Sequence, residues 1–390
     1  MSSLFHNHEE YRLERRSSPA LRWVLVYKGV FVVCALCSAI FLDDYQRAYH
    51  EGFNEIYHAP WPRAEAITFA SRFATWGAAP YLTIARNGYT PGSPLCAYYP
   101  LLPALIAPVA RCISAPAAFL WGLLLVNSLS VVGVLQLYRY FLEQSDHATA
   151  RLATLLFLMF PGAIFLSFIY TESLFLVLSL IALRALHSGK NVAFAMAAFL
   201  MPLTKAIGVF VLIPAVYHFA ITGRKRGWWI MVFPLLGWVA YLGVMFYFTG
   251  DPFEGLKAQR FFANSASIEN IFNVGEFLSS ALSWNQSLFD PAGGVLDRLT
   301  FVAFITGVAC SYRFSKEELY YVIAIGMIPA MSHHFVSYTR YVTVCFPVFL
   351  GFGNVLRTIN KAWLTIVIMS YFSVLQFYCL IRHVNFKWVS

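Results

Sequence analysis

Long apolar runs separated by short polar connections follow one another along most of this 390-residue chain. A helix needs about twenty apolar residues to cross the hydrocarbon core of a bilayer. By this criterion we expect an all-α chain that crosses a membrane about eleven times. The expected spans are residues 22–42, 115–138, 149–166, 173–187, 191–203, 205–221, 228–248, 297–312, 319–331, 341–356 and 363–383.

Residues 98–112 are also apolar, but they are too few to span a membrane and prolines interrupt them. We expect this segment to lie in the membrane interface. If it does not cross, most of the cationic connections fall on the same side as the Arg-rich N-terminus, including the basic run 224–226. Cytoplasmic loops are enriched in Lys and Arg, so the N-terminus is predicted to be cytoplasmic and the C-terminus extracytoplasmic.

Two long segments then lie outside the cytoplasm, residues 43–114 and about 249–296. The second opens with a turn-rich segment, residues 249–252. Apolar residues flanked by Lys257 and Arg260 follow, which is typical of an amphipathic surface helix. The chain shows no repeat of fixed period, and we expect residues 1–390 to form a single transmembrane domain.

The composition supports a membrane protein, because 59% of the residues are hydrophobic and only 12% are charged. A soluble globular protein has about 25% charged residues. The net charge of +9 is compatible in principle with nucleic-acid binding. The basic residues are spread between apolar runs and form no basic face, so we exclude nucleic acid as a partner.

Two acidic positions at the outer side are candidates for chemistry. Asp43 and Asp44 end the first expected span, where a carboxylate can accept a proton from a sugar hydroxyl, or can simply end the helix and face water. Glu172 lies in the Tyr-Thr-Glu-Ser segment 170–173 at a helix start. It has a structural interpretation as a helix-dipole partner. A carboxylate near membrane depth is also a functional candidate, because its burial is costly.

Lys205 and Arg340 each open an inward-going helix at the same side. Cations at helix N-termini oppose the helix dipole, which favours an anionic partner for them. A phosphate is the obvious anion, and Arg can bind it through two hydrogen bonds. The alternative is that both side chains snorkel to lipid headgroups.

Several of these segments, in this order, resemble the PIG-V family and its shorter bacterial relatives. PIG-V proteins add the second mannose to glycosylphosphatidylinositol and belong to the GT-C glycosyltransferases. The resemblance covers most of the chain, from about Trp76 to Pro347. The matching segments are Trp76, residues 84–89, 98–103, 161–175, 250–259 and 340–347.

The resemblance implies a GT-C-like bundle and an inverting transfer of a monosaccharide, mannose or another hexose, from a polyprenyl-phosphate donor. The acceptor is a glycan, lipid or protein outside the cytoplasm, and we expect no cofactor and no metal. The family usually has Trp-Asp where this chain has Trp76-Gly77, so either another carboxylate acts as the base or the protein has lost catalysis. The implied catalytic candidates are Asp44, Asp43 and Glu65, and the implied substrate-binding residues are Trp76, Tyr89, Tyr99, Glu172, Lys205, Arg260 and Arg340.

Two other functions remain open. The missing carboxylate at Gly77 motivates an inactive relative that binds a polyprenyl lipid or presents it to a partner subunit. A lipid or sugar transporter is the other alternative, although transporters tend to place polar residues at the membrane midplane. The short length favours a bacterial plasma membrane over the endoplasmic reticulum, by resemblance.

Overall fold

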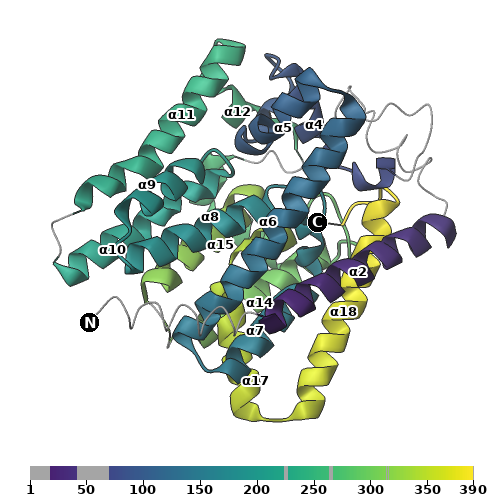
Figure 1. The fold of residues 1–390 in the computed structure, drawn as a ribbon, viewed down its shortest axis with the longest axis vertical. Helices are drawn as coiled ribbons and strands as arrows, with labels where there is room; N and C mark the ends of the chain where they lie inside the picture. The colour runs from purple at the N-terminus through teal and green to yellow at the C-terminus, as the bar shows by residue number, and fades with distance from the viewer. Residues whose placement is uncertain are drawn as a thin grey trace.

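The computed structural model describes residues 18–41, 70–223, 227–262, 267–312, 314 and 316–389. Over these ranges the chain consists of helices and their connections and contains no β-strand, which confirms the predicted all-α class (Figure 1). The helices are α2 (Ser18–Phe41), α4 (Ala78–Asn87), α5 (Leu101–Cys112), α6 (Ala115–Gln144), α7 (His147–Met159), α8 (Glu172–His187), α9 (Asn191–Leu200), α10 (Leu212–Thr222), α11 (Val232–Thr249), α12 (Glu254–Lys257), α13 (Val274–Leu282), α14 (Val295–Ser311), α15 (Lys316–His333), α16 (Tyr338–Val344), α17 (Pro347–Ile359) and α18 (Ala362–Val384).

Each of the eleven expected spans contains a helix of this set. Among the described residues, four helices are long and apolar enough to cross a bilayer alone, namely α2, α6, α11 with the turn before it, and α18. A fifth candidate is the pair α16 and α17, which is bent by 78°. The remaining apolar helices are shorter, so the membrane class is clear while the number of crossings stays a prediction.

The outer loops contain short helices, as expected. α5 has 12 residues, which gives a length of about 18 Å, well below the roughly 30 Å of a hydrocarbon core. The segment predicted as an amphipathic helix in the second loop forms α12 and then the single turn η6 (Ala258–Phe261). Phe253 and Phe261 are exposed on it, as a membrane-surface segment requires.

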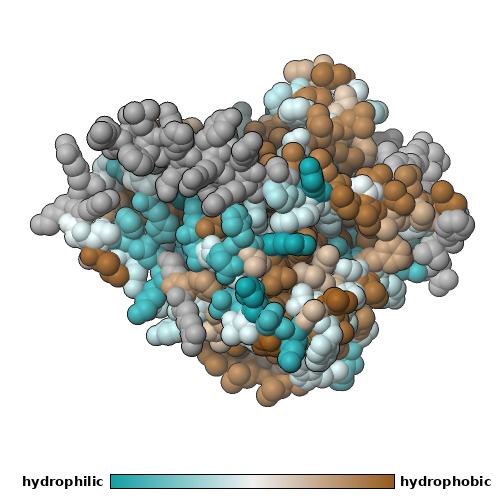
Figure 2. Space-filling model, turned by 60° about the horizontal axis from the view of Figure 1, so that its bottom comes forward, coloured by the Kyte–Doolittle hydropathy of each residue, from teal (hydrophilic) through white to brown (hydrophobic). Residues whose placement is uncertain are grey.

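Apolar side chains cover much of the outside of the bundle. α18 exposes Trp363, Ile366, Val367, Tyr371 and Val374, which recur every three or four residues along one helix face. Figure 2 shows broad hydrophobic areas on one face of the molecule, with the hydrophilic residues gathered between them. A soluble monomer rarely exposes apolar surface of this extent, whereas lipid tails cover it in an integral membrane protein.

Glycines allow the inner helices to pack closely. A Cβ added at Gly353 of α17 would lie 2.9 Å from the backbone nitrogen of Ala153 in α7. A Cβ at Gly237 of α11 would lie 2.2 Å from the carbonyl oxygen of Phe199 in α9. Close backbone approach through small residues is the usual way in which membrane helices associate. Figure 1 shows the result, with α2 and α18 side by side at one edge and α9, α10 and α11 at the other.

Three expected spans are broken helices, and these breaks shape the functional end of the bundle. α7 ends at Met159, and Pro161 opens the 3₁₀ segment η3 (Pro161–Leu166). The span expected at 205–221 begins as a second 3₁₀ segment, η4 (Ala206–Val211). α16 and α17 are separated just before Pro347. Proline lacks the amide hydrogen that a continuing helix needs, so the proline breaks are local in origin.

The orientation of these helices is testable by labelling cysteines. In a cysteine-free background, Asn87→Cys at the end of α4 should react with a membrane-impermeant thiol reagent added to intact cells. Lys361→Cys, between α17 and α18, should react only after the membrane is permeabilised. Both positions are exposed, so accessibility rather than burial decides the outcome. Labelling of the two variants from the same side would contradict the topology.

Candidate active site

One cavity of about 500 Å³ lies where the broken helix ends meet the outer loops. This volume is typical of a small-molecule site. Its wall contains nine Trp, Tyr or Phe side chains and three cations among other residues. The lining side chains with polar or aromatic groups include Trp76, Tyr81, Tyr98, Tyr99, Tyr170, Lys205, Trp238, Lys257, Gln259, Glu269, His333, Arg340, Tyr341, His383 and Trp388.

A buried carboxylate joins two cations at this cavity. Glu172 is the first residue of α8 and is fully buried. Its Oε1 accepts a hydrogen bond of 3.0 Å from Lys205 Nζ, which lies just before η4. The same oxygen accepts hydrogen bonds from Arg340 in α16, 3.1 Å from Nε and 3.0 Å from a terminal nitrogen. The sequence spacing of 33 and 168 residues shows that three separate elements meet here.

The two cations reach the cavity and Glu172 does not. Lys205 and Arg340 belong to the cavity wall, and their side chains are 10% and 19% exposed. The Arg340 guanidinium lies 4.5 Å from the centre of the Tyr170 ring, and Lys205 Nζ lies 5.1 Å from that of Tyr341. Cation–π contacts and the shared carboxylate hold both charges in place. Each cation has N–H donors beyond those that point to Glu172.

Asp297 fixes the helix that bears Arg340. This buried carboxylate lies in the first turn of α14, and its Oδ1 accepts hydrogen bonds from the Thr339 amide at 2.8 Å and the Thr339 hydroxyl at 2.9 Å. His334, Phe335 and Ser337, just before α16, all have positive φ. A non-glycine residue in the left-handed region costs energy, so surrounding contacts such as those of Asp297 must maintain this turn.

Gly77 stands where the family usually has Asp. The Tyr170 ring fills the space that a side chain at position 77 would occupy. The Gly77 amide donates a hydrogen bond of 2.9 Å to the Tyr170 hydroxyl. A Cβ at Gly77 would lie only 2.8 Å from Tyr170 Cε1. Trp76 before it has a φ of 48°, and its indole stacks on Phe386 with ring centres 4.8 Å apart. The backbone here therefore approaches an aromatic ring that leaves no room for a carboxylate.

The structure places the other predicted site residues in two groups. Trp76 and Tyr99 line the cavity, and Tyr99 stacks on Tyr241 with ring centres 4.8 Å apart. Tyr89 and Arg260 are not part of the cavity wall. The Tyr89 hydroxyl donates a hydrogen bond of 2.8 Å to the Tyr98 carbonyl oxygen, which supports the loop behind the wall. Their assignment as substrate-binding residues stays a prediction. The predicted bases Asp43, Asp44 and Glu65 lie outside the described residues.

Two further residues become candidates only in the structure. Lys257 lines the cavity and donates a hydrogen bond to Asp251, which belongs to the family-like segment 250–252. This hydrogen bond holds the pKa of Asp251 below its usual value. His383, at the end of α18, is buried against Phe168 and Tyr170 and also lines the cavity. Two features of the sequence could have indicated these residues. Lys257 follows the acidic turn at Asp251, and His383 ends the apolar run 363–383.

A comparison with protein families identifies the family of this chain. Residues 38–231, about half of the chain, match the family model described as mannosyltransferase (PIG-V). The chain belongs to the PIG-V mannosyltransferase family. The matched region contains Glu172. It also contains the lining residues of the cavity from Trp76 to Ile207, among them Gly77, Tyr170 and Lys205.

The other comparisons add little. A search of curated proteins finds no match. The crystal structure of the Archaeoglobus fulgidus oligosaccharyltransferase in the apo form is similar, with a TM-score of 0.48 and 15% sequence identity. The alignment covers 93% of this chain and 56% of that one, so this PIG-V relative spans little more than half of the length of the archaeal protein.

Removing the buried carboxylate should destabilise the protein strongly. Glu172→Gln leaves two neighbouring cations without their anion, and breaking a buried ion pair typically costs about 3–5 kcal/mol. The partial exposure of Lys205 and Arg340 reduces this cost, so we expect a loss of about 2–3 kcal/mol. Thermal unfolding in detergent measures it. The control Glu143→Gln breaks an ion pair of two partly exposed side chains with Arg184 and should cost less than about 1 kcal/mol. Equal losses of stability in both variants would contradict the conclusion that Glu172 holds Lys205 and Arg340 in place.

The Gly77–Tyr170 contact predicts an energetic coupling. Gly77→Ala should lower the unfolding temperature, because the added methyl group collides with the buried Tyr170 ring. The loss should shrink in a Tyr170→Leu background, since the two residues touch. Gly243→Ala in α11 is the matched control, because nothing lies within 4 Å of its added Cβ. Additive effects of the two substitutions would disprove the contact.

Proposed function

We propose that this PIG-V family member transfers a monosaccharide, mannose or another hexose, from a polyprenyl-phosphate donor to an acceptor at the extracytoplasmic face. The observation that supports this most is the pair of cations, Lys205 and Arg340, fixed at the wall of an aromatic cavity in a membrane chain of this family. Membrane lipids supply the environment in which a polyprenyl chain can reach this end of the bundle.

The charge at the cavity suits such a donor. Two cations and one carboxylate leave one net positive charge in the group of Glu172, Lys205 and Arg340. A polyprenyl-phosphate sugar is a phosphodiester with one negative charge. When the bond from the sugar C1 to the phosphate oxygen breaks, the phosphate departs with the electron pair and its negative charge grows. Donors fixed where charge develops lower the barrier to reaction. In this proposal Lys205 and Arg340 supply that charge without a metal or cofactor.

The acceptor needs a base. As its hydroxyl oxygen attacks C1 from the face opposite the phosphate, its proton passes to a carboxylate. This in-line attack inverts the configuration at C1. We propose Asp44 or Asp43 as the base, with Glu65 as a further candidate. Among the described lining residues the one carboxylate is Glu269, which is exposed at the rim. Because Tyr170 closes the position of Gly77, a carboxylate from elsewhere in the chain is required.

A second candidate function rests on the same contact at Gly77. A chain whose usual catalytic position is closed by Tyr170 could bind a polyprenyl-phosphate lipid without turnover and present it to a partner subunit. The cavity and its cations would serve binding equally well. Transport is less well supported, because the polar residues described above gather at one end of the bundle rather than at its midplane.

The proposed setting is a bacterial plasma membrane, with the N-terminus in the cytoplasm and the cavity outside. This assignment rests on the distribution of Lys and Arg between loops and on the resemblance to the shorter bacterial relatives. The acceptor then belongs to the outer leaflet or the space beyond it.

Transfer of radiolabelled sugar tests the enzyme. Reconstituted protein should transfer label from polyprenyl-phosphate-mannose to a membrane extract. Arg340→Ala and the double variant Asp43→Asn/Asp44→Asn should lose at least about 100-fold in rate, in line with the effect of removing a charge-stabilising or general-base group. Arg357→Ala, at an exposed position in the last turn of α17, is the matched control and should retain transfer.

The outcomes separate the two candidates. If Arg340→Ala loses transfer and the Asp43→Asn/Asp44→Asn variant retains it, the proposed role of Arg340 is supported and the Asp pair is rejected as the base. If wild type transfers neither mannose nor glucose nor arabinose from such donors, but binds the lipid in a manner that needs Arg340, the binding function replaces the enzyme. Normal transfer by both variants would reject the assigned site.

A further inference from the structure

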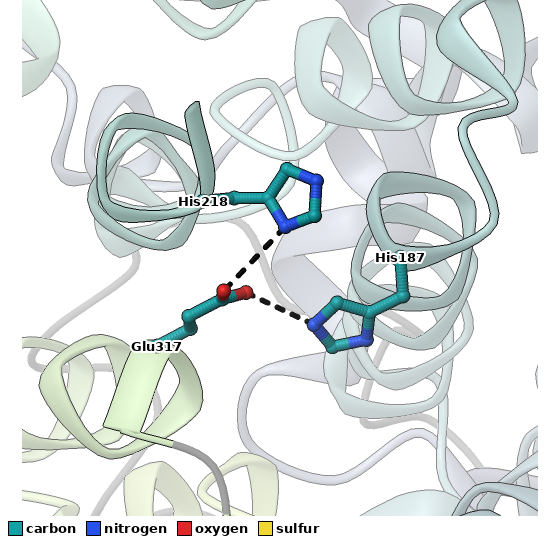
Figure 3. A group of neighbouring side chains, drawn as sticks. All are labelled: His187, His218 and Glu317. Carbon is teal, nitrogen blue, oxygen red and sulfur yellow. Dashed lines mark hydrogen bonds and ion pairs between the residues drawn. The ribbon is translucent and has the colours of Figure 1, made fainter. Parts of the chain in front are cut away.

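A second cluster of chemically competent side chains lies at the opposite end of the helices that build the cavity. It contains His187 at the end of α8, His218 in α10 and Glu317 in the first turn of α15 (Figure 3). α8 begins at Glu172 and has 16 residues, so the two sites are about 24 Å apart along this helix. By the proposed topology the cluster faces the cytoplasm.

The three side chains converge on one point. His187 Nε2 lies 3.0 Å from Glu317 Oε2, and His218 Nδ1 lies 3.5 Å from Glu317 Oε1. One ligand atom from each residue falls within 4.8 Å of the other two. Figure 3 shows both imidazole rings with a nitrogen pointing toward the carboxylate. Metal–ligand distances of about 2.0–2.2 Å in a tetrahedron put neighbouring ligand atoms roughly 3.4 Å apart, which small side-chain rotations reach.

A second carboxylate, Glu318, lies near the cluster, close enough to become a hydrogen-bond partner of His187 after a small side-chain movement. The other nitrogen of His187, Nδ1, lies 3.9 Å from Glu318 Oε1. Glu318 is nearly buried and accepts hydrogen bonds of 2.8 and 3.1 Å from the Gln144 side chain. A carboxylate behind a ligating histidine commonly sets its tautomer and ring orientation.

Access and ligand type narrow the class of ion. His187 is 39% exposed, whereas His218 and Glu317 are 11% and 16% exposed, so an ion can enter from the surface and then be largely enclosed. Two imidazoles and one carboxylate suit zinc and its first-row neighbours, and not calcium or magnesium, which prefer oxygen ligands alone. Three protein ligands leave a fourth position for water.

We propose that His187, His218 and Glu317 bind one divalent transition-metal ion, of the zinc class, which joins α8, α10 and α15 at their cytoplasmic ends. The ion acts as a structural clamp. It adds metal–ligand bonds between three helices that the contacts of Glu317 with His187 and His218 already bring together at this end. Since α8 and α15 continue to Glu172 and His333 at the cavity, the clamp limits their relative movement there. This site is separate from the sugar-transfer chemistry, for which no metal is invoked.

Metal binding to the purified full-length chain tests the proposal. The protein is prepared without a polyhistidine tag, stripped with a chelator and titrated with Zn²⁺ alone. Wild type should bind about one zinc per chain by elemental analysis, and its unfolding temperature should rise with zinc concentration, because an ion that binds only the folded state stabilises it. Co²⁺ in place of Zn²⁺ should give the visible absorption of a four-coordinate site.

Variants separate this site from adventitious binding. His218→Ala should weaken zinc binding at least tenfold and remove the thermal shift. His147→Ala, an exposed histidine at the start of α7, is the matched control and should bind like wild type. If His218→Ala does not fold, Glu317→Gln serves instead, because it keeps the shape and a hydrogen-bonding group. Equal zinc binding by wild type and a folded cluster variant, or no stoichiometric binding by wild type, would overturn the proposal, whatever the transfer assay shows.

Discussion

The functional end of this protein depends on the buried carboxylate of Glu172. Lys205 and Arg340 both lie at helix N-termini, where a positive charge opposes the helix dipole, and they lie close enough to repel each other. Glu172 at the start of α8 is in the opposite situation, because its charge complements the dipole there. One anion therefore stabilises two unfavourable cations and ties α8, η4 and α16 together. Lys205 and Arg340 are held at the cavity wall as a consequence.

Breaks in the helices also shape this end of the bundle. The spans expected at 149–166 and 341–356 are interrupted at Pro161 and before Pro347. The left-handed residues His334, Phe335 and Ser337 form the turn that precedes Arg340, and Ser337 belongs to the cavity wall. Irregular backbone is tolerated at membrane depth where it is buried in protein or lines a polar cavity. Strain at the segment before Arg340 is offset by the hydrogen bonds from Thr339 to Asp297.

Hydrophobic periodicity predicts which segments are helical, and each expected span contains a helix. It also predicts that Glu172, Lys205 and Arg340 share a membrane face, because the direction of each helix follows from the order of spans. It does not predict that they touch, since the contact depends on how helices separated by up to 168 residues pack. For the same reason the sequence predicts that both Tyr89 and Tyr99, from the neighbouring segments 84–89 and 98–103, bind substrate, while the structure puts only Tyr99 on the cavity wall. The His187, His218 and Glu317 cluster was missed because its members are far apart in the chain.

The exchange at Gly77 shows how one position can redirect the chemistry of a whole site. A side chain at 77 and the ring of Tyr170 compete for the same volume, so a carboxylate at 77 requires the ring or the backbone to shift. Tyr170 also lies under the Arg340 guanidinium at 4.5 Å, so its ring simultaneously closes the position and orients the cation. Restoring Asp at 77 alone would therefore disturb the ring on which the Arg340 guanidinium lies. In the proposed reaction the base therefore comes from a segment of the chain other than the one that contains Gly77.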